Sequence, residues 1–492
     1  MRNVYFTYII TLALCCFNFN TTIAQPKTAK DVGVDVYFAH YSEWMANTVC
    51  FNQSVYHNDN SIVAEAMLDT WLAYPDHISY DVREAVKNYA ALVNEEGTVA
   101  DWNADKASQL DYIRPGRFFI RYYNLIDKQK DEKFTKFCSN LLDYLGKMGR
   151  TMSGSTPNGP WFHKSIAYPN QVWLDGSYMG IPFYSLAGPE LKSEQKEAIF
   201  TDAVTQLELI DKVTYDQPTD LWRHGWDENC KTKWACKEFN YDFGAPETYD
   251  KTSGRSSHAW GRAMGWYAMA CLEVLDNMEE FEIPHTDKRY QSMLSLFGRI
   301  MNSVKAHQDP TSNLWYCILD VAPNDAAYRS VNKKRDNYIE ATASAMFTYC
   351  MLRGYYDGYL TDASYFEAGK KAYCSMIKTL VQDNRDNGIN LAQCCKAGGL
   401  NNEKDGSFAY YMNEDIVMND NKGVAPFIWA SLAAEKMGYD MLSNSFSKPY
   451  VKKEPRVISV KKQTEKTTTT NSNKKTTNST NKTKTGGTKT RK

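Results

Sequence analysis

Three parts of the sequence place acidic, basic and aromatic residues just before apolar helical segments. These parts are Leu110–Asp111, Trp161–Lys164 with Gln171–Gly176, and Trp222–Asp227 with Ser257–Arg262. Carboxylates can transfer protons, aromatic rings can stack on sugar faces, and a cation can bind an acidic substituent. If the three parts meet at one end of the fold, this combination of residue types predicts a sugar-binding pocket.

Arg262, Trp266 and Lys164 are the candidate substrate contacts that follow from the residues themselves. Burying a guanidinium on a mostly apolar helix is unfavourable unless an acidic side chain or an anionic ligand pairs with it. For Arg262 we expect the partner to be the substrate. Trp266 lies one helical turn later on the same face, where it either stacks on the sugar or packs in the core. Lys164 either lies beside an acidic sugar or is solvated.

The elements that must position these residues are predicted to be helices. About twelve segments between Asp35 and Met437 carry apolar residues at helical spacing, and almost none alternates with a period of two. They lie near 35–50, 60–71, 80–93, 110–125, 131–149, 170–187, 192–213, 257–277, 287–307, 338–357, 361–382 and 423–437.

These segments also alternate in character along the chain. Those near 131, 192, 287 and 361 have charged faces, whereas those near 170, 257, 338 and 423 are rich in small and apolar residues. A helix that is apolar nearly all round is buried, and one with a polar stripe lies outside. The pattern predicts an all-α fold, an (α/α)6 barrel of six inner and six outer helices, with a plain helical bundle or solenoid as the alternative.

Four motifs follow one another in this body, and the residues that carry them are Asn170–Phe183 (NQVWLDGSYMGIPF), His224–Asp227 (HGWD), Trp260–Trp266 (WGRAMGW) and Lys422–Phe427 (KGVAPF). Together they resemble glycoside hydrolase family 105, the unsaturated rhamnogalacturonyl hydrolases, over a region from about Tyr89 to Gly438. The resemblance also implies an (α/α)6 barrel, in agreement with the helical pattern.

The resemblance implies a reaction on the products of polysaccharide lyases, which carry a 4,5-unsaturated uronic acid at the non-reducing end. The family hydrates this double bond, after which the sugar ring opens and the glycosidic link breaks. Carbon 4 must be protonated and water must add at carbon 5, so one carboxyl group can first donate and then accept a proton. The expected partner is an unsaturated uronyl oligosaccharide of the rhamnogalacturonan, pectin or ulvan type, and no cofactor is implied.

Motif positions assign roles to particular side chains. Asp175 matches the general acid and base, and Asp111 matches a second aspartate of the family. The acid must be protonated at working pH, so we expect its pKa to be raised by burial against Trp173 and by a charged neighbour, for which Asp111 is the candidate. Helix capping is the alternative role for both aspartates.

His163 and His224 match positions that contact the sugar or its carboxylate. The predicted substrate-binding residues are therefore His163, His224, Arg262, Trp266, Trp173 and Lys164.

The sequence also departs from the family pattern. Phe51–His57 lacks the expected aromatic and glycine arrangement, so no contact is carried over from it, and Ala263-Met264 replace part of the glycine-rich arginine motif. The segment Lys231–Ser256 is longer than expected, and such loops often determine specificity. Family 88 unsaturated glucuronyl hydrolases, which act on glycosaminoglycan fragments, and a non-catalytic glycan-binding protein remain alternatives.

The two ends of the chain differ from the body. Residues 1–24 have the basic start, short apolar run and small residues of a cleaved signal peptide, with a lipoprotein anchored near Cys15 or Cys16 as the alternative. Lys448–Lys492 contains 14 Lys and Arg residues, two acidic ones and few apolar ones, which predicts a disordered tail. The expected domains are thus a signal peptide (1–24), a catalytic domain (25–446) and a basic tail (447–492), in a periplasmic or extracellular protein.

Other functional classes find no support in the sequence. The body is acidic, unlike the basic surface of a nucleic-acid-binding domain, and no later segment is apolar enough to span a bilayer. Phosphate-binding glycine loops, a Gly-x-Ser-x-Gly elbow and a His-Glu-x-x-His helix are absent. His224, Cys230 and Cys236 do not complete a zinc pattern, so no metal is predicted. Disulfides between Cys230 and Cys236 or between Cys394 and Cys395 are left open, as is the oligomeric state.

Overall fold

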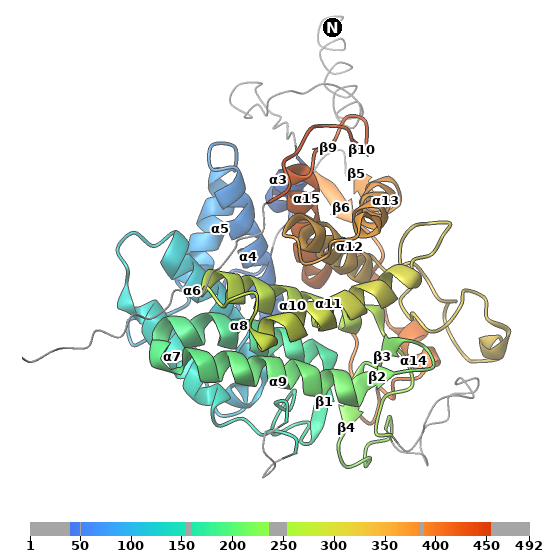
Figure 1. Cartoon of the computed structure of the whole chain (residues 1–492), viewed down its shortest axis with the longest axis horizontal. Helices are drawn as coiled ribbons and strands as arrows, with labels where there is room; N and C mark the ends of the chain where they lie inside the picture. The colour runs from blue at the N-terminus through green and yellow to red at the C-terminus, as the bar shows by residue number, and fades with distance from the viewer. Residues whose placement is uncertain (1–39, 50, 153–158, 236–252, 384–387, 454–492) are drawn as a thin grey trace, which may run out of the picture. The chain divides into compact units, whose positions relative to one another are not determined.

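Six helices of a computed structural model form a continuous inner layer, and their bounds are α4 (Asn58–Ala73), α6 (Pro115–Leu125), α8 (Leu174–Leu191), α10 (Gly261–Glu280), α12 (Ala341–Tyr356) and α15 (Asn421–Lys436). Each packs against the next in this order, and α15 packs in turn against α4. Figure 1 shows this cyclic packing, with the blue N-terminal helices near the red C-terminal α15. Almost every residue of α10 is buried, as expected for a helix that is apolar nearly all round.

A second set of helices packs on the outside of the first, with the bounds α3 (Tyr41–Thr48), α5 (Tyr80–Ala90), α7 (Glu132–Leu145), α9 (Lys196–Thr214), α11 (Lys288–Ala306) and α13 (Ala363–Thr379). Apart from α3, which has no exposed residue, each buries one face and leaves the other polar. In α7, Asp131 caps the first turn by accepting from the Lys133 N–H, and the buried residues recur every three or four positions from Phe134 to Leu145.

The predicted all-α fold is confirmed, and the segments predicted to be inner and outer take those places. The strands are short antiparallel pairs in the connections: β1 (Gln171–Trp173) with β4 (Gly225–Asp227), β2 (Tyr215–Asp216) with β3 (Leu221–Trp222), β5 (Val381–Asp383) with β6 (Ile389–Leu391), β7 (Cys394–Cys395) with β8 (Ile416–Val417), and β9 (Tyr439–Asp440) with β10 (Ser445–Phe446). Two or three residues are too few for an alternating pattern. The sequence therefore predicted neither these strands nor the small helix α14 (Phe408–Asn413).

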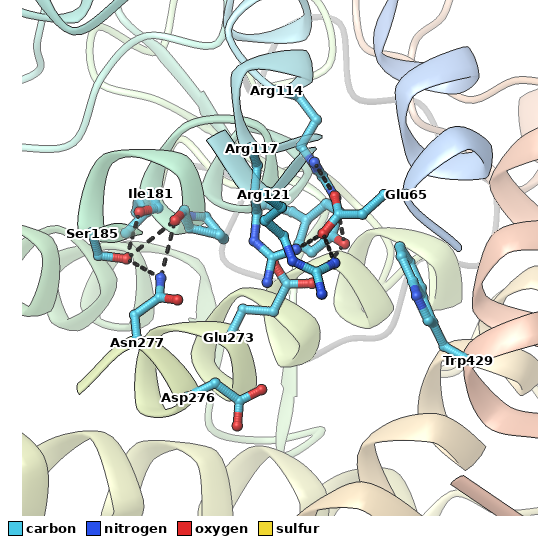
Figure 2. Close-up of polar contacts among 12 residues, drawn as sticks. Glu65, Arg114, Arg117, Arg121, Ile181, Ser185, Glu273, Asp276, Asn277 and Trp429 are labelled. Atoms are coloured by element: carbon cyan, nitrogen blue, oxygen red, sulfur yellow. Dashed lines mark hydrogen bonds and ion pairs between the residues drawn. The ribbon is translucent and has the colours of Figure 1, made fainter. Parts of the chain in front are cut away.

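A buried network of charges joins α4, α6 and α10. Glu65 of α4 contacts three arginines, with 2.9 Å to Arg114, 2.8 Å to Arg121 and a short contact to Arg117, whose Nε also lies 3.0 Å from Glu273. Figure 2 shows the guanidinium groups converging on Glu65. An unpaired charge at this depth would be strongly destabilising, so the network fixes how the three helices pack.

The structure describes residues 40–49, 51–152, 159–235, 253–383 and 388–453. The predicted signal peptide and nearly all of the predicted tail lie outside these ranges. Residues beyond 446 still contact the body, because the Tyr450 ring packs on Phe366 and Lys453 Nζ lies 3.2 Å from Asp357. The packed part of the chain thus extends past the predicted boundary at 446. Within the described ranges, no helix has the length and apolar character needed to cross a membrane.

Candidate active site

Four of the inner helices, α4, α8, α10 and α15, direct their N-terminal ends toward one cavity of about 240 Å³. Asp175, Arg262 and Lys422 each occupy the second position of their helices, and Asn58 is the first residue of α4. Asp111 lies in a single helical turn just before α6. All five residues line the cavity. The N-terminus of a helix carries a partial positive charge, so this arrangement favours an anionic ligand.

Backbone hydrogen bonds between the connections align the polar residues. Leu110 N–H donates to the His163 carbonyl (3.1 Å), His163 N–H donates to Gln171 (3.0 Å), and Leu174 N–H donates to His224 (3.0 Å). The antiparallel pairing of β1 with β4 continues this alignment, with Trp173 opposite Gly225. Segments distant in sequence are thereby held side by side, which brings Asp111, His163, Asp175 and His224 to one end of the inner helices.

Asp175 lies against His224, whose Nε2 is 3.1 Å from Oδ2 of the carboxylate. The contact is close, although the N–H is poorly aligned for a hydrogen bond. His224 is fully buried, and its Nδ1 is 2.7 Å from the Tyr411 hydroxyl. His224 does not line the cavity itself. The predicted sugar contact by His224 is therefore replaced by a contact with Asp175, behind the face that a ligand would meet.

The prediction of a raised pKa for Asp175 is wrong for this site. Burial acts to raise this pKa, but His224, His163 and Arg262 together lower it by more than burial raises it. The net effect is a pKa below the ordinary value. The neighbours that outweigh burial are cationic or hydrogen-bond donors, whereas the prediction assumed a carboxylate. Without a ligand, the structure thus stabilises Asp175 as an anion.

Asp111 is surrounded by donors. Lys164 Nζ lies 3.0 Å from its Oδ2, His163 Nε2 lies 3.8 Å from the same atom, and the Asn58 side-chain amide donates to Oδ1 over 3.2 Å. Burial acts to raise the pKa of Asp111, but His163, Lys164 and His57 bring it below the ordinary value. Asp111 therefore remains charged, as predicted, and neither aspartate acts as the N-cap of its helix.

His163 and Trp173 form a stacked wall of the cavity. Their ring centroids are 4.5 Å apart at 15°, and Tyr168 also stacks on Trp173 at 5.0 Å. A side chain at Gly176 would place a Cβ only 3.1 Å from His163 Nδ1, so any larger residue would press on the imidazole. Burial lowers the pKa of His163 despite the nearby Asp111. The Trp173 ring thus stacks on two protein rings, His163 and Tyr168, and its predicted role in substrate binding stays a prediction.

Arg262 is buried at the cavity wall. One of its Nη atoms donates to the Cys395 carbonyl, and the guanidinium lies over the Trp260 ring at 4.5 Å. Among the described residues, its Nε has no hydrogen-bond partner. The Cys395 carbonyl and the Trp260 ring therefore compensate part of this positive charge, and Arg262 is one of the residues that line the cavity.

Trp266 lines the cavity but is only 1% exposed, and its ring stacks on Tyr178 at 4.8 Å and 22°. This geometry agrees with the core-packing alternative. Lys164 was expected either to lie beside an acidic sugar or to be solvated. In the structure it is paired with Asp111.

Several residues at the cavity were not identified from the sequence. They are His57, Asn58, Asp59, Tyr168, Met179, Lys422, the loop residues Lys396–Gly399, Asn401 and Lys404, and, behind His224, Tyr411. His57 ends the segment from which no contact was carried over. A usable indication was present at Asn58 and Asp59, because polar residues opening an apolar helix match the pattern at Asp175. The loop 396–404 and Tyr411 have no such pattern, since tertiary packing alone brings them here.

The cysteines and the long loop of this region are described in part. Cys394 and Cys395 are not joined, and no group of three or more His, Cys, Asp or Glu side chains in the described ranges could hold a metal ion. Cys236 and most of the long loop 231–256 lie outside the described residues.

Comparison with known proteins supports the resemblance found in the sequence. The profile of Glycosyl Hydrolase Family 88 matches residues 34–438. A solved glycoside hydrolase from family 105 of C. acetobutylicum ATCC 824 is 29% identical, with 80% of this chain and 99% of that chain covered and a TM-score of 0.67.

Two further relatives are more distant. The unsaturated rhamnogalacturonyl hydrolase YesR of Bacillus subtilis (strain 168) is 24% identical over 180 residues, which are 36% of this chain and 39% of YesR. The unsaturated glucuronyl hydrolase of Bacillus sp. GL1, which is responsible for degradation of glycosaminoglycan, is 14% identical with a TM-score of 0.51, covering 87% of this chain and 95% of that one. The latter likeness concerns the fold alone. The profile match, which spans residues 34–438 and so most of the sequence, shows that the chain is a glycoside hydrolase of Glycosyl Hydrolase Family 88.

Proposed function

We propose that this hydrolase removes a 4,5-unsaturated uronic acid from the non-reducing end of oligosaccharides made by polysaccharide lyases, of the rhamnogalacturonan, pectin or ulvan type. The observation that carries the proposal is the Asp175 carboxyl group at a small cavity, with Arg262 and Lys164 on its walls. A volume of about 240 Å³ lies below the range of roughly 300–1,000 Å³ that suits drug-sized ligands. It suits a single terminal sugar.

The anionic character of the substrate has several supports. The N-terminal ends of α4, α8, α10 and α15 meet at the cavity, and Lys164, Lys396, Lys404 and Lys422 also line it. Arg262 also lines the cavity and adds a positive charge there. A bidentate carboxylate suits a guanidinium, so we assign the uronate carboxylate to Arg262.

In the proposed reaction, Asp175 donates its proton to carbon 4 of the enol ether, and positive charge develops at carbon 5 and the ring oxygen. Water then adds to carbon 5 and returns a proton to the Asp175 carboxylate. The resulting hemiketal opens to a ketone, which exposes carbon 1 as a hemiacetal that expels the following sugar. Asp111, held as an anion by Lys164, accepts hydrogen bonds from the sugar hydroxyls.

The pKa of Asp175 is lowered in the free enzyme, and the scheme requires that the bound substrate raises it. A bound uronate neutralises Arg262 and adds a negative charge nearby, and both changes favour the protonated carboxyl. Asp175 would then be charged in the free enzyme and become an acid only when the substrate is in place.

A second candidate is an unsaturated glucuronyl hydrolase that acts on glycosaminoglycan fragments. Lys396 and Lys404 favour it, because cations on the loop that borders the cavity suit the further anionic groups of such fragments. A non-catalytic glycan-binding protein is not retained, since the chain belongs to a hydrolase family.

We also propose that the inner and outer helices make an (α/α)6 barrel, with the active site at one mouth, and that residues 1–24 direct export to the periplasm or the exterior. The cyclic packing of the inner helices supports the barrel. The leader-like composition of the N-terminus supports export.

The substrate assignment is tested by following the ultraviolet absorbance of the conjugated uronyl group in lyase digests of several polysaccharides. We expect the absorbance to fall with at least one digest. Once the double bond has been chemically saturated, the enzyme should cleave none of the same oligosaccharides. Activity only on glycosaminoglycan digests would select the second candidate, and release of sugar from the saturated oligosaccharides would contradict both.

A further inference from the structure

The hydroxyl of Tyr411 is buried behind the proposed catalytic carboxyl. Tyr411 belongs to α14, the small helix that the sequence did not predict, and its side chain is fully buried. Its Oη lies 2.7 Å from His224 Nδ1, and its ring stacks on Trp260 at 5.7 Å and 26°. On the opposite side of the same imidazole, Nε2 lies 3.1 Å from Asp175 Oδ2. The three side chains thus form a chain that leads from the protein interior to the cavity.

The direction of the first hydrogen bond follows from what each group can do. Burial raises the pKa of Tyr411 well above its ordinary value, so the hydroxyl keeps its proton. A buried tyrosine O–H needs an acceptor, and His224 Nδ1 is its hydrogen-bond partner in the described part of the chain. Nδ1 must then be the unprotonated nitrogen, and the imidazole proton lies on Nε2, which faces Asp175.

We propose that Tyr411 is a positioning residue that holds His224 in the Nε2–H tautomer and thereby sets the protonation of Asp175. The inference rests on the proposed function, because the tautomer matters only if Asp175 transfers the proton. An Nε2–H donor stabilises the Asp175 carboxylate. The other tautomer would present a lone pair, which stabilises the carboxylic acid instead.

The other charged and titratable groups near this chain do not depend on the Tyr411 hydroxyl. Around Asp175 they are His163 and Arg262, and around Tyr411 they are Tyr410, Cys317 and Asp320. The aromatic rings of Trp173 and Trp260 pack on His224 and carry no charge. Removal of the Tyr411 hydroxyl should therefore act on Asp175 through His224.

The test is the pH dependence of kcat/KM for the Tyr411→Phe variant on an unsaturated uronyl disaccharide. The acid form of Asp175 is needed, so activity falls as pH rises through its pKa. Loss of the bias toward Nε2–H raises this pKa. We expect the alkaline limb to move upward by about half a pH unit, the lower end of the range for one hydrogen bond, because the N–H is poorly aligned with the carboxylate. The control is Tyr373→Phe, which removes another buried hydroxyl, bonded to Ser431 at 2.9 Å, and should leave the limb in place.

A measurement on the unaltered protein covers the case in which Tyr411→Phe does not fold. Nitrogen NMR of protein labelled at histidine, with His224 assigned by the signal lost in His224→Gln, should show Nε2 protonated and Nδ1 unprotonated. A proton on Nδ1 of His224, or an unshifted limb in a folded Tyr411→Phe variant, would overturn the inference. If either result is found while the wild type is active and Asp175→Asn is inactive, only the proposed role of Tyr411 is refuted. An inactive wild type would refute the proposed function, and the role of Tyr411 with it.

Discussion

Lys164 Nζ lies 3.0 Å from Oδ2 of Asp111. The pair joins the two connections that precede α6 and β1, and it lies on the wall of the cavity. Lys164 therefore adds a positive charge to the site and, with His163 and His57, helps to keep Asp111 ionised.

Lys164→Met should lower kcat/KM by roughly ten- to a hundred-fold, the range of a charge-assisted hydrogen bond. The pKa of Asp111 is held down in part by Lys164, and activity that needs the carboxylate is lost as pH falls through this pKa. Without the lysine the pKa rises, so the loss on acidification should begin at a higher pH. Lys164→Arg, which keeps the charge, should retain most of the activity. A Met variant with an unchanged profile would show that the pair is not needed.

Arg262→Gln should raise KM at least about ten-fold, because it removes the proposed partner of the uronate carboxylate. The matched comparison uses the methyl ester of the same unsaturated disaccharide, which has no charge at that position. We expect the penalty of the substitution to shrink strongly with the ester. An equal penalty with both substrates would mean that Arg262 acts through its bond to the Cys395 carbonyl, and the melting temperature of the variant would report that role.

The alkaline limb of kcat should lie at a higher pH than the alkaline limb of kcat/KM. The former reports the enzyme with substrate bound and the latter reports the free enzyme. In the free enzyme the pKa of Asp175 is below its ordinary value, so the protonated form is lost early as pH rises. A bound uronate raises this pKa, which extends the activity of the complex to higher pH. Coincident limbs would contradict the proposed effect of the substrate on Asp175.

Much of this site could be predicted because its residues occupy sequence positions with a recognisable local pattern. Asp175, Arg262 and Lys422 all stand at the second position of an apolar helix, and the sequence places the first two correctly at one pocket. Helical spacing likewise identified the inner and outer helices.

The parts that were missed depend on contacts between distant segments. The pKa of Asp175 depends on His224, which approaches through the pairing of β1 with β4. Tyr411 reaches the site from a six-residue helix, too short to show periodicity. The Trp173 ring was expected to face the substrate, but its partners His163 and Tyr168 are evident only in three dimensions.

Glu65→Gln should destabilise the protein by about 3–5 kcal/mol, the usual cost of removing one partner from a buried ion pair. The substitution leaves Arg114, Arg117 and Arg121 with less compensating charge at the centre of the inner helices. The control is Glu84→Gln, since Glu84 pairs with Lys87 at the surface and such pairs contribute less than about 1 kcal/mol. Denaturant unfolding of both variants makes the comparison. Equal stabilities would show that the network does not hold the helices together.

The central claim is that Asp175 transfers the proton to the unsaturated sugar, and the most direct measurement is the absorbance decay of an unsaturated uronyl disaccharide with Asp175→Asn. The amide is nearly the same shape but cannot donate and recover a proton in this way. We predict a loss of at least about a thousand-fold in kcat, at the centre of the range for general acid–base catalysis, with a melting temperature close to that of the wild type. A folded Asp175→Asn variant that consumes the disaccharide at the wild-type rate would contradict the claim.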